Sequence, residues 1–413
     1  MSRTSGKRRL RVAVLAVLGA AAVLVPLGGT AAGAPQGAAP VTITINTLPI
    51  ANGLPLDIGI KQGFFADQGI TINKRVLQSG NDIMLALANN QGEIGYVGWV
   101  PAMIARTQGI ALTAVAASDV EGTSEADNWQ NILVRGNSAI RTPADLAGKT
   151  IAVNALKGVG EVMIKAALKK RGVDPGSIRL LAMPFPAMRS ALANGQVDAI
   201  WTPEPFMSQV LSDGGRVVMA PGPVLGKFFP IGVYVARQDW VQRNPGVATR
   251  FRTAMNRSLA YAQANPGEIR QLLPEAIRNI RLPIWSPLAD RAQLSALAGF
   301  AKEYGLITTL PNLALLVPSS IAGGKTLQGQ VGNRYILLRQ DGKQVTRLAA
   351  GRYTFVVQDT SKTQAFKLTG PGVSRTTPVA GTGRSTWTLT LRRGTYVFTT
   401  TGKPLIRRTF RVV

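Results

Sequence analysis

Two stretches of the chain have the same order of sequence features: ALANNQGEIGYVGWVPA at residues 86–102 and ALANGQVDAIWTPEP at residues 191–205. Each predicts the end of a helix, a turn of Asn and Gly, a short β-strand, and then a Trp followed by a Pro. Because a whole unit of secondary structure returns in the same order, the sequence predicts two similar α/β lobes.

The sequence around these stretches supports the same prediction. Short β-branched runs alternate with segments of helical period. The predicted strands are 41–46, 70–77, 93–99, 149–154, 177–183 and 196–201, and the predicted helices are 54–69, 81–91, 159–171 and 187–194. Strands separated by helices are typical of parallel βαβ units. We expect the two lobes to face each other across a crevice that holds a ligand.

The composition changes after residue 316. Residues 317–332 are rich in Gly and Ser, which predicts a linker. Residues 333–413 contain short strand-like runs separated by Gly and Pro, which predict a separate all-β sandwich.

The residue types present exclude several kinds of chemistry. The 413 residues include no Cys and no His. Without Cys there is no disulfide, thiolate nucleophile or cysteine-ligated metal, and without His there is no Ser-His-Asp triad. Carboxylate, Lys or Tyr chemistry and oxygen-ligated metals stay open, but no paired carboxylates stand out. We expect a protein that is not an enzyme and that holds no metal and no cofactor.

Residues 1–34 predict a secretory signal peptide. Five Lys and Arg lie in the first eleven residues, an apolar run covers 12–29, and small residues follow at 30–34. An uncleaved N-terminal anchor is the alternative, because this apolar run is at the lower limit for a membrane span. We expect an exported protein, periplasmic or at the cell surface. It would not be a lipoprotein, because there is no Cys to carry a lipid.

Five segments in the middle of the chain resemble one protein family. They are PLDIGIKQGFFADQGITI at 55–72, ALANNQGEIGYVG at 86–98, RTPADLAGKTIAV at 141–153, ALANGQVDAIWTPEPF at 191–206 and PIGVYVARQDWVQRNPGVATRF at 230–251. In this order they resemble the solute-binding proteins of ABC importers, in the branch for nitrate, sulfonates, taurine and thiamine-pyrimidine precursors. The resemblance implies an α/β two-lobed, type II periplasmic-binding-protein-like fold over residues 41–316. Lobe 1 would cover about 41–130 and 231–316, and lobe 2 about 132–228.

The same resemblance implies a function. The protein would capture a small solute that is sulfonate, nitrate, carboxylate or pyrimidine-like, and deliver it unaltered to an ABC permease in the cytoplasmic membrane. An enzyme is the rival, since the family includes pyrimidine-synthesising members. Those members use an active-site histidine, which this chain lacks.

The C-terminal region resembles the cupredoxin-type sandwich that is fused to some exported proteins. The segments that carry this resemblance are 350–372 and 394–413. Where copper-binding relatives supply His and Cys, this chain has Lys367, Thr400 and Lys403, so a copper-free sandwich is implied.

The charge of the C-terminal region suggests a further partner. Residues 328–413 carry fifteen Lys and Arg against two Asp. This favours binding to anionic envelope polymers, or else a solvated basic face with no partner. An envelope-associated structural or adhesive protein with a vestigial solute site is the alternative function. Nucleic acid is not expected as a partner, because no basic stripe with interleaved aromatics is present.

Ligand contacts are expected on the loops that follow strands and begin helices. Unpaired backbone N–H groups and the positive end of the helix dipole point there. These loops, together with the crossovers between the lobes, give the candidates Asn52, Ser79, Asn81, Trp99, Lys157, Gly158, Val159, Trp201, Glu204 and Phe229. Trp99 and Trp201 hold corresponding positions in the two lobes and are predicted to face each other and stack on a planar ligand. Lys157 suits a carboxylate or sulfonate, and Glu204 suits an ammonium or amidine.

The candidates also have structural alternatives. Ser79 and Asn81 suit N-caps, each worth about 1 kcal/mol. Lys157 would otherwise be a solvated surface charge, and the two Trp would be packed in the walls of the lobes. Glu204 would otherwise hold lobe 2 together by pairing with a basic residue.

Overall fold

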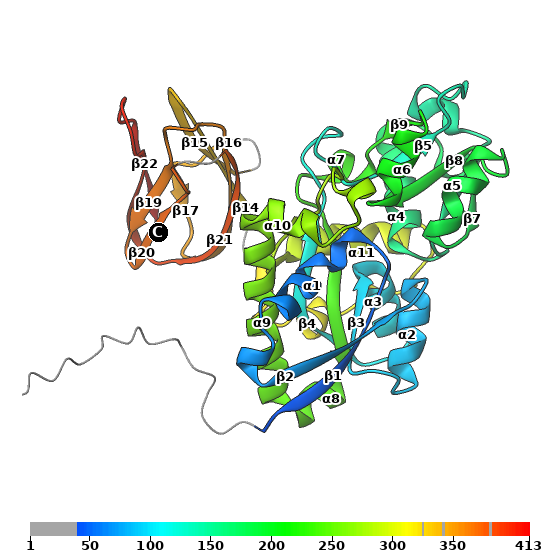
Figure 1. The fold of residues 1–413 in the computed structure, drawn as a ribbon, viewed down its shortest axis with the longest axis horizontal. Helices are drawn as coiled ribbons and strands as arrows, with labels where there is room; N and C mark the ends of the chain where they lie inside the picture. Colours follow the sequence, from blue (N-terminus) through cyan, green and yellow to red (C-terminus); the bar gives the residue numbers. More distant parts are fainter. Residues whose placement is uncertain (1–38, 324–325, 341–342, 380–381) are drawn as a thin grey trace, which may run out of the picture.

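The computed structural model describes residues 39–323, 326–340, 343–379 and 382–413. It contains two α/β lobes and a β-sandwich (Figure 1). The predicted signal peptide, residues 1–34, lies outside the described residues. Within the described ranges, no helix has the length and apolar character needed to cross a bilayer.

Lobe 1 is built on a mixed six-stranded sheet in the order β11–β4–β10–β3–β1–β2. Its strands are β1 Val41–Thr47, β2 Ile70–Val76, β3 Ile94–Gly98, β4 Leu112–Val120, β10 Pro230–Arg237 and β11 Ile284–Trp285. Its helices are α1 Leu54–Lys61, α2 Gly80–Ala88, α3 Trp99–Thr107, α8 Gln238–Arg243, α9 Pro245–Ala264, α10 Pro266–Gln271, α11 Arg291–Glu303 and α12 Leu313–Leu316. β1 pairs in parallel with β2 and β3, whereas β10 returns from lobe 2 and pairs antiparallel with β3 and β4. Every residue of β4 is buried, as expected for a strand covered on both faces.

Lobe 2 has a five-stranded sheet in the order β7–β6–β8–β5–β9. Its strands are β5 Gln130–Val134, β6 Thr150–Val153, β7 Arg179–Ala182, β8 Ala199–Pro203 and β9 Arg216–Met219. Its helices are α4 Val159–Lys170, α5 Phe185–Ala193, α6 Phe206–Ser212 and α7 Pro221–Leu225. β6 pairs in parallel with β7 and β8, so the two lobes share the parallel βαβ core that the sequence predicts.

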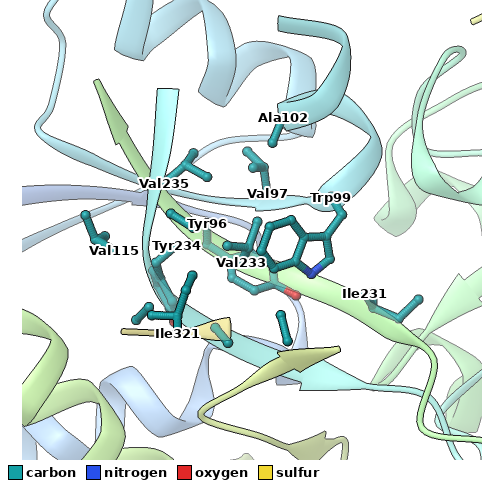
Figure 2. Packing of buried hydrophobic residues seen from close by; sticks show 14 of the residues in the cluster. Tyr96, Val97, Trp99, Ala102, Val115, Ile231, Val233, Tyr234, Val235 and Ile321 are labelled. Carbon is teal, nitrogen blue, oxygen red and sulfur yellow. The ribbon is translucent and has the colours of Figure 1, made fainter. Parts of the chain in front are cut away.

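Each lobe has its own apolar core. In lobe 1 the cluster includes Tyr96, Trp99 and Tyr234 at the centre of the sheet (Figure 2). The rings of Tyr96 and Tyr234 meet edge to face, with their centroids 5.4 Å apart. Ile50 and Val159 pack against the cores of both lobes, so the lobes touch each other at these side chains.

The C-terminal region forms two five-stranded sheets packed face to face. One has the order β16–β15–β14–β18–β21, and the other β17–β23–β22–β19–β20. The strands are β14 Thr326–Gly332, β15 Tyr335–Gln340, β16 Lys343–Gln344, β17 Arg347–Leu348, β18 Gly351–Asp359, β19 Phe366–Gly370, β20 Val373–Thr376, β21 Gly383–Leu391, β22 Gly394–Thr400 and β23 Arg407–Val412. Residues of both sheets share one core, which includes Phe355, Phe366 and Phe398.

The linker predicted over residues 317–332 needs correction. Its last seven residues form β14, which lies between β15 and β18 in the first sheet of the sandwich. Leu327 and Val331 are fully buried in the sandwich core, and this burial outweighs the Gly-rich composition. Upstream of β14, the short strand β13 Ala322–Gly323 pairs with β12 Ala289–Asp290 of the first lobe region.

Candidate functional site

A cavity lies between the two lobes. Its walls consist of residues from both: Leu48, Ile50, Asn52, Gly80, Asn81, Tyr96, Gly98, Pro101 and Ile231 from lobe 1, and Trp129, Gln130, Asn154, Ala155, Gly158, Val159, Phe185, Trp201 and Pro203 from lobe 2 and its edge. The volume of the cavity is only about 40 Å³. Sites for small molecules typically measure roughly 300–1,000 Å³, so in this arrangement of the lobes the cavity is a narrow slot.

Four helices begin at this cavity. α2 begins at Gly80, α4 at Val159 and α5 at Phe185, while Gly98 is the N-cap of α3, and all four of these residues line the wall. The first backbone N–H groups of a helix have no intrahelical partner, and the helix dipole places positive charge there. None of the lining residues is a Lys, Arg, Asp or Glu. The electrostatic character of the wall therefore comes from the helix ends, which favour an anionic group.

An aromatic wall belongs to lobe 2. Trp201 and Phe185 both line the cavity, with ring centroids 6.4 Å apart. A Cβ atom on Gly160 would lie 2.6 Å from the Trp201 ring, so glycine at this position lets α4 pack directly against the indole. Nε1 of Trp201 is buried and has no hydrogen-bond partner among the described residues. A buried donor without a partner is costly, so an acceptor on a bound solute would be favourable there.

A buried carboxylate lies behind the lobe 1 wall. Nδ2 of Asn52 donates to Oδ1 of Asp119 at 2.8 Å, and the hydroxyl of Tyr96 donates to Oδ2 at 2.9 Å. Asp119 is 2% exposed, and burial raises its pKa to about 6, although the hydrogen bonds from Tyr96 and Asn52 act in the opposite direction. Above about pH 6 the Asp119 carboxylate therefore carries a negative charge directly behind Asn52 and Tyr96, which line the cavity. Oδ1 of Asn52 has no hydrogen-bond partner among the described residues, so it can accept from a solute.

A second buried carboxylate lies where β4 leaves lobe 1. Oε1 of Glu121 accepts a hydrogen bond from Nε2 of Gln130, and its backbone N–H donates to the carbonyl of Phe229 at 2.8 Å. Burial raises the pKa of Glu121 to about 8, so the side chain is mostly neutral at pH 7. The hydrogen bond from Glu121 to Phe229 thus joins the two chain segments that connect the lobes, and the neutral carboxyl group of Glu121 lies beside it.

Five of the predicted ligand residues line the cavity. Two lie in lobe 1 and three in lobe 2: Asn52, Asn81, Gly158, Val159 and Trp201. Asn81 also spans the gap, because its Nδ2 donates to the carbonyl of Leu156 in lobe 2 at 3.5 Å. These residues come from loops that are far apart in the sequence, and the structure brings them together as the strand-end argument predicts. Their contact with a ligand remains a prediction.

The predicted pairing of Trp99 with Trp201 across the cavity needs correction. Trp99 is fully buried in the lobe 1 core and does not line the cavity (Figure 2). It begins α3, and its side chain packs among the apolar residues of the lobe 1 core. The second Trp in the lining is instead Trp129, which lies at the end of the crossover from lobe 1 to lobe 2.

Four further candidates also lie outside the cavity lining. Ser79 caps α2, since its hydroxyl accepts from the backbone N–H of Asp82. Lys157 is exposed, with its backbone N–H donating to Glu161 at 2.8 Å. Phe229 is buried in the lobe 1 core.

Glu204 is the fourth of these candidates, and it connects the lobes. Its carboxylate accepts from the hydroxyl of Ser208 at 2.7 Å and from the backbone N–H of Arg281 at 3.1 Å. Its carbonyl accepts from the N–H of Ala51 at 2.9 Å. Since Ala51 and Arg281 belong to lobe 1, this buried carboxylate holds the two lobes against each other. Burial raises its pKa.

Sequence reasoning missed several residues of the site, among them Tyr96, Asp119, Trp129 and Asn154. Asn154 directly follows β6, so the strand-end rule could have found it. Tyr96 lies within the repeated stretch at 86–102, and Trp129 lies next to the predicted boundary between the lobes. Nothing in the sequence distinguishes Asp119, because its role depends on β4 lying beside β10.

The comparison with protein families identifies the two-lobed region. Residues 51–269, more than half of the chain, match the family described as NMT1/THI5 like. The chain belongs to this family. Among the curated relatives of this NMT1/THI5-like protein is the taurine-binding periplasmic protein of Escherichia coli (strain K12). It is 29% identical over 206 residues, which cover 49% of this chain and 61% of the relative. The nitrate/nitrite binding protein NrtA of Nostoc sp. is 24% identical over 217 residues, or 49% of each chain.

Solved structures show the fold of the NMT1/THI5-like chain. The alkanesulfonate-binding protein SsuA from Xanthomonas axonopodis pv. citri bound to MOPS has a TM-score of 0.58 at 21% identity, covering 68% of this chain and 99% of that one. The fold is therefore α/β and two-lobed, of the type II periplasmic-binding-protein kind, with an additional C-terminal β-sandwich. The desulfurization enzyme DszB has the same fold at a TM-score of 0.52 and 16% identity. The chain spans about three-fifths of the taurine-binding relative's length.

Proposed function

We propose that this protein is the extracytoplasmic solute-binding component of an ABC importer, and that its solute is a small molecule with an anionic group, foremost a sulfonate. The main support is the convergence of four helix N-termini on a cavity whose lining has no charged side chain. A fixed set of backbone N–H donors binds an anion without a cationic side chain. The taurine- and alkanesulfonate-binding relatives are consistent with this solute class.

The lobe 1 side of the cavity suits a second group on the same solute. Oδ1 of Asn52 is an unpartnered acceptor, and Asp119 lies directly behind it. An ammonium or hydroxyl group would find an acceptor there, and an ammonium would also be attracted by the buried carboxylate. A solute with an anionic group at one end and a hydrogen-bond donor at the other would therefore use both sides.

Binding would act by holding the lobes together. A solute in the cavity would contact Asn81 and Asn52 of lobe 1 and Gly158 of lobe 2 at the same time. Contacts that exist only when the lobes meet shift the equilibrium toward the closed form, which the permease would recognise. No step in this process makes or breaks a bond in the solute.

A thermal-shift screen tests this function. The panel contains taurine, ethanesulfonate, MOPS, nitrate, a short carboxylate and a pyrimidine, each followed by calorimetry and by mass spectrometry of the recovered solute. A solute at about 100 times its dissociation constant adds about 2.7 kcal/mol of stability. Asn81→Leu should weaken binding about tenfold, since it removes a polar contact to a charged group. The matched control is Asn89→Leu at the other end of the same helix.

Two results would contradict the proposal. In one, no member of the panel shifts the transition of the intact protein. In the other, the solute is recovered chemically altered, which would make the protein an enzyme.

The β-sandwich offers a second candidate function, namely attachment to an anionic polymer of the cell envelope. Four exposed cations lie on the outer side of the sheet β17–β23–β22–β19–β20. Arg347 of β17 is paired with Arg411 of β23. Lys367 of β19 and Arg407 of β23 are both paired with Thr399 of β22, which lies between them. The only acidic residue that the structure describes in the sandwich is Asp359, which is buried. We propose that this face binds the polymer electrostatically, while a cupredoxin-like origin of the sandwich stays a prediction.

Retention on an immobilised polyanion, measured by the salt concentration that elutes the intact protein, tests this second role. Lys367→Ser with Arg407→Ser should elute at lower salt, because the attraction is electrostatic and screened. Arg375→Ser, an exposed cation on the other side of the sheet edge, is the matched control. Equal elution of all three proteins would exclude this face as the binding surface.

A further inference from the structure

The β-sandwich packs directly against the segments that connect the two lobes. Val356 of β18 forms a buried apolar cluster with Val120, Phe228 and Ile284. Val120 is the last residue of β4, before the first crossover, and Phe228 lies on the second crossover. Ile284 belongs to β11 of lobe 1 and pairs with Val120. One sandwich side chain thus packs in a cluster with the last residue before the first crossover, with the second crossover and with the edge strand of lobe 1.

An ion pair reinforces this contact. Nη2 of Arg384, on β21, lies 3.3 Å from Oδ2 of Asp127 on the first crossover. The guanidinium also lies over the Phe228 ring, with Cζ 5.9 Å from the centroid. Asp127 shapes the crossover itself, because its carboxylate accepts from the backbone N–H groups of Thr123 and Ser124. Arg384 therefore holds the residue that fixes the conformation of this loop.

The side chains that make these contacts point away from the sandwich interior. Phe355 and Val357, on either side of Val356, belong to the sandwich core, whereas Val356 does not. In the register of the sheet, Arg384 lies opposite Gln358 and therefore on the same side as Val356. β21 of the sandwich lies next to α9 of lobe 1 (Figure 1). This outer side of the sheet is thus a docking surface for the hinge, and it can be altered without disturbing the core.

The crossovers are the segments that must change when the lobes move apart. They are held to each other by the N–H of Phe228, which donates to the carbonyl of Gly122 at 3.4 Å, and by the bond from Glu121 to Phe229. In the same arrangement the lobes touch through Glu204, and Lys169 of α4 pairs with Glu303 of α11 at 2.5 Å. The sandwich contacts are therefore made while the two lobes touch each other, and we call this the closed arrangement.

We propose that the docked β-sandwich stabilises the closed arrangement of the two lobes and thereby sets the affinity for the solute. A domain that docks on the crossovers better in the closed arrangement than in the open one shifts the open–closed equilibrium toward the closed arrangement. The size of the shift equals the difference between the docking free energies in the two arrangements. Loss of the docking contacts should therefore favour the open form and weaken solute binding. Only the affinity part of this proposal rests on the proposed solute-binding function.

Distance measurements between the lobes test the proposal without any solute. Because the chain has no Cys, Ala88→Cys on α2 and Ala193→Cys on α5 introduce two unique sites for spin labels at exposed positions. The interlobe distance distribution is then measured in the otherwise unchanged protein, in Val356→Asp and in Arg384→Ala. Both variants should show a larger fraction of long distances. Arg375→Ala, an exposed sandwich arginine away from the hinge, should match the unchanged protein.

Calorimetry with the solute that gives the largest thermal shift supplies the second measurement. The docking variants should bind it at least about fivefold more weakly, which is the lower range of typical coupling between sites. Arg384→Ala keeps the test valid if Val356→Asp does not fold. Unchanged distances in a folded Arg384→Ala protein would overturn the proposal, whether or not any solute binds. Failure of every solute to bind, together with altered distances, would instead contradict the proposed function alone.

Discussion

Replacement of Glu121 by Gln should change the pH dependence of stability in a defined way. Glu121 is fully buried where the chain leaves lobe 1, and burial raises its pKa from 4.5 to about 8. One carboxylate oxygen accepts from Gln130, and the other has no hydrogen-bond partner among the described residues. Gln keeps the shape and the acceptor while removing the titration.

The sign and magnitude follow from the two pKa values. A folded-state pKa above the unfolded value gives stability that is fully present below pH 4.5 and is lost as the pH rises through 8. At about 1.4 kcal/mol per pH unit, a rise from 4.5 to about 8 corresponds to a loss on the order of 5 kcal/mol. The Gln variant does not have this loss. The free energy of unfolding of the variant minus that of the unchanged protein should therefore be near zero at pH 4.5. This difference should grow up to about pH 8 and stay constant at higher pH.

Urea unfolding followed by Trp fluorescence at a series of pH values measures this difference. The difference between the free energies of unfolding of the two proteins cancels the contributions of titrating groups that do not interact with Glu121. Glu125→Gln, at an exposed position on the same crossover, is the matched control for the removal of one carboxylate from this segment. A Glu121→Gln difference that is the same at pH 5 and pH 9 would refute the assignment of Glu121 as a buried neutral acid.

Three further substitutions test the cavity and its support. Gly160→Ala should displace the Trp201 indole from the cavity wall, because a Cβ would lie 2.6 Å from the ring. Calorimetry should show that the solute affinity falls about tenfold. An unchanged affinity would show that Trp201 does not contribute to the site. Gly232→Ala would overlap the Asp119 carboxylate and should lower the free energy of unfolding by about 1–3 kcal/mol, which urea unfolding would detect. Ser79→Ala should cost about 1 kcal/mol through loss of the helix cap while leaving solute affinity unchanged, so a loss of affinity at constant stability would show that this hydroxyl contacts solute.

The two-lobed α/β fold could be predicted because its signals are local. Period-two and helical runs, the turn glycines and the repeated stretches at 86–102 and 191–205 all act over a few residues. The strand β10 shows where local reasoning ends, since its antiparallel place between β3 and β4 depends on the chain returning from lobe 2. The same applies to β14, whose Gly-rich sequence hides two buried side chains.

The site was predictable only at the level of loops. The strand-end rule brought Asn52, Asn81 and Gly158 to the correct edge, because helix starts meet there in any sheet of this design. It could not say which way a side chain points, so Trp99 was placed in the cavity although it packs in the core. Asp119 was out of reach, because its proximity to the cavity arises from strand pairing rather than from any pattern in the sequence.

The central claim is that a small anionic solute binds between the lobes, at the helix ends. A crystal of the intact protein with 2-bromoethanesulfonate tests it most directly, because the bromine can be located by its anomalous scattering. We predict one strong bromine peak inside the cavity bounded by Asn52, Gly158 and Trp201, with the sulfonate against the first N–H groups of α2 and α4. A bromine found only on the outer surface of the lobes or on the basic sandwich would contradict the claim.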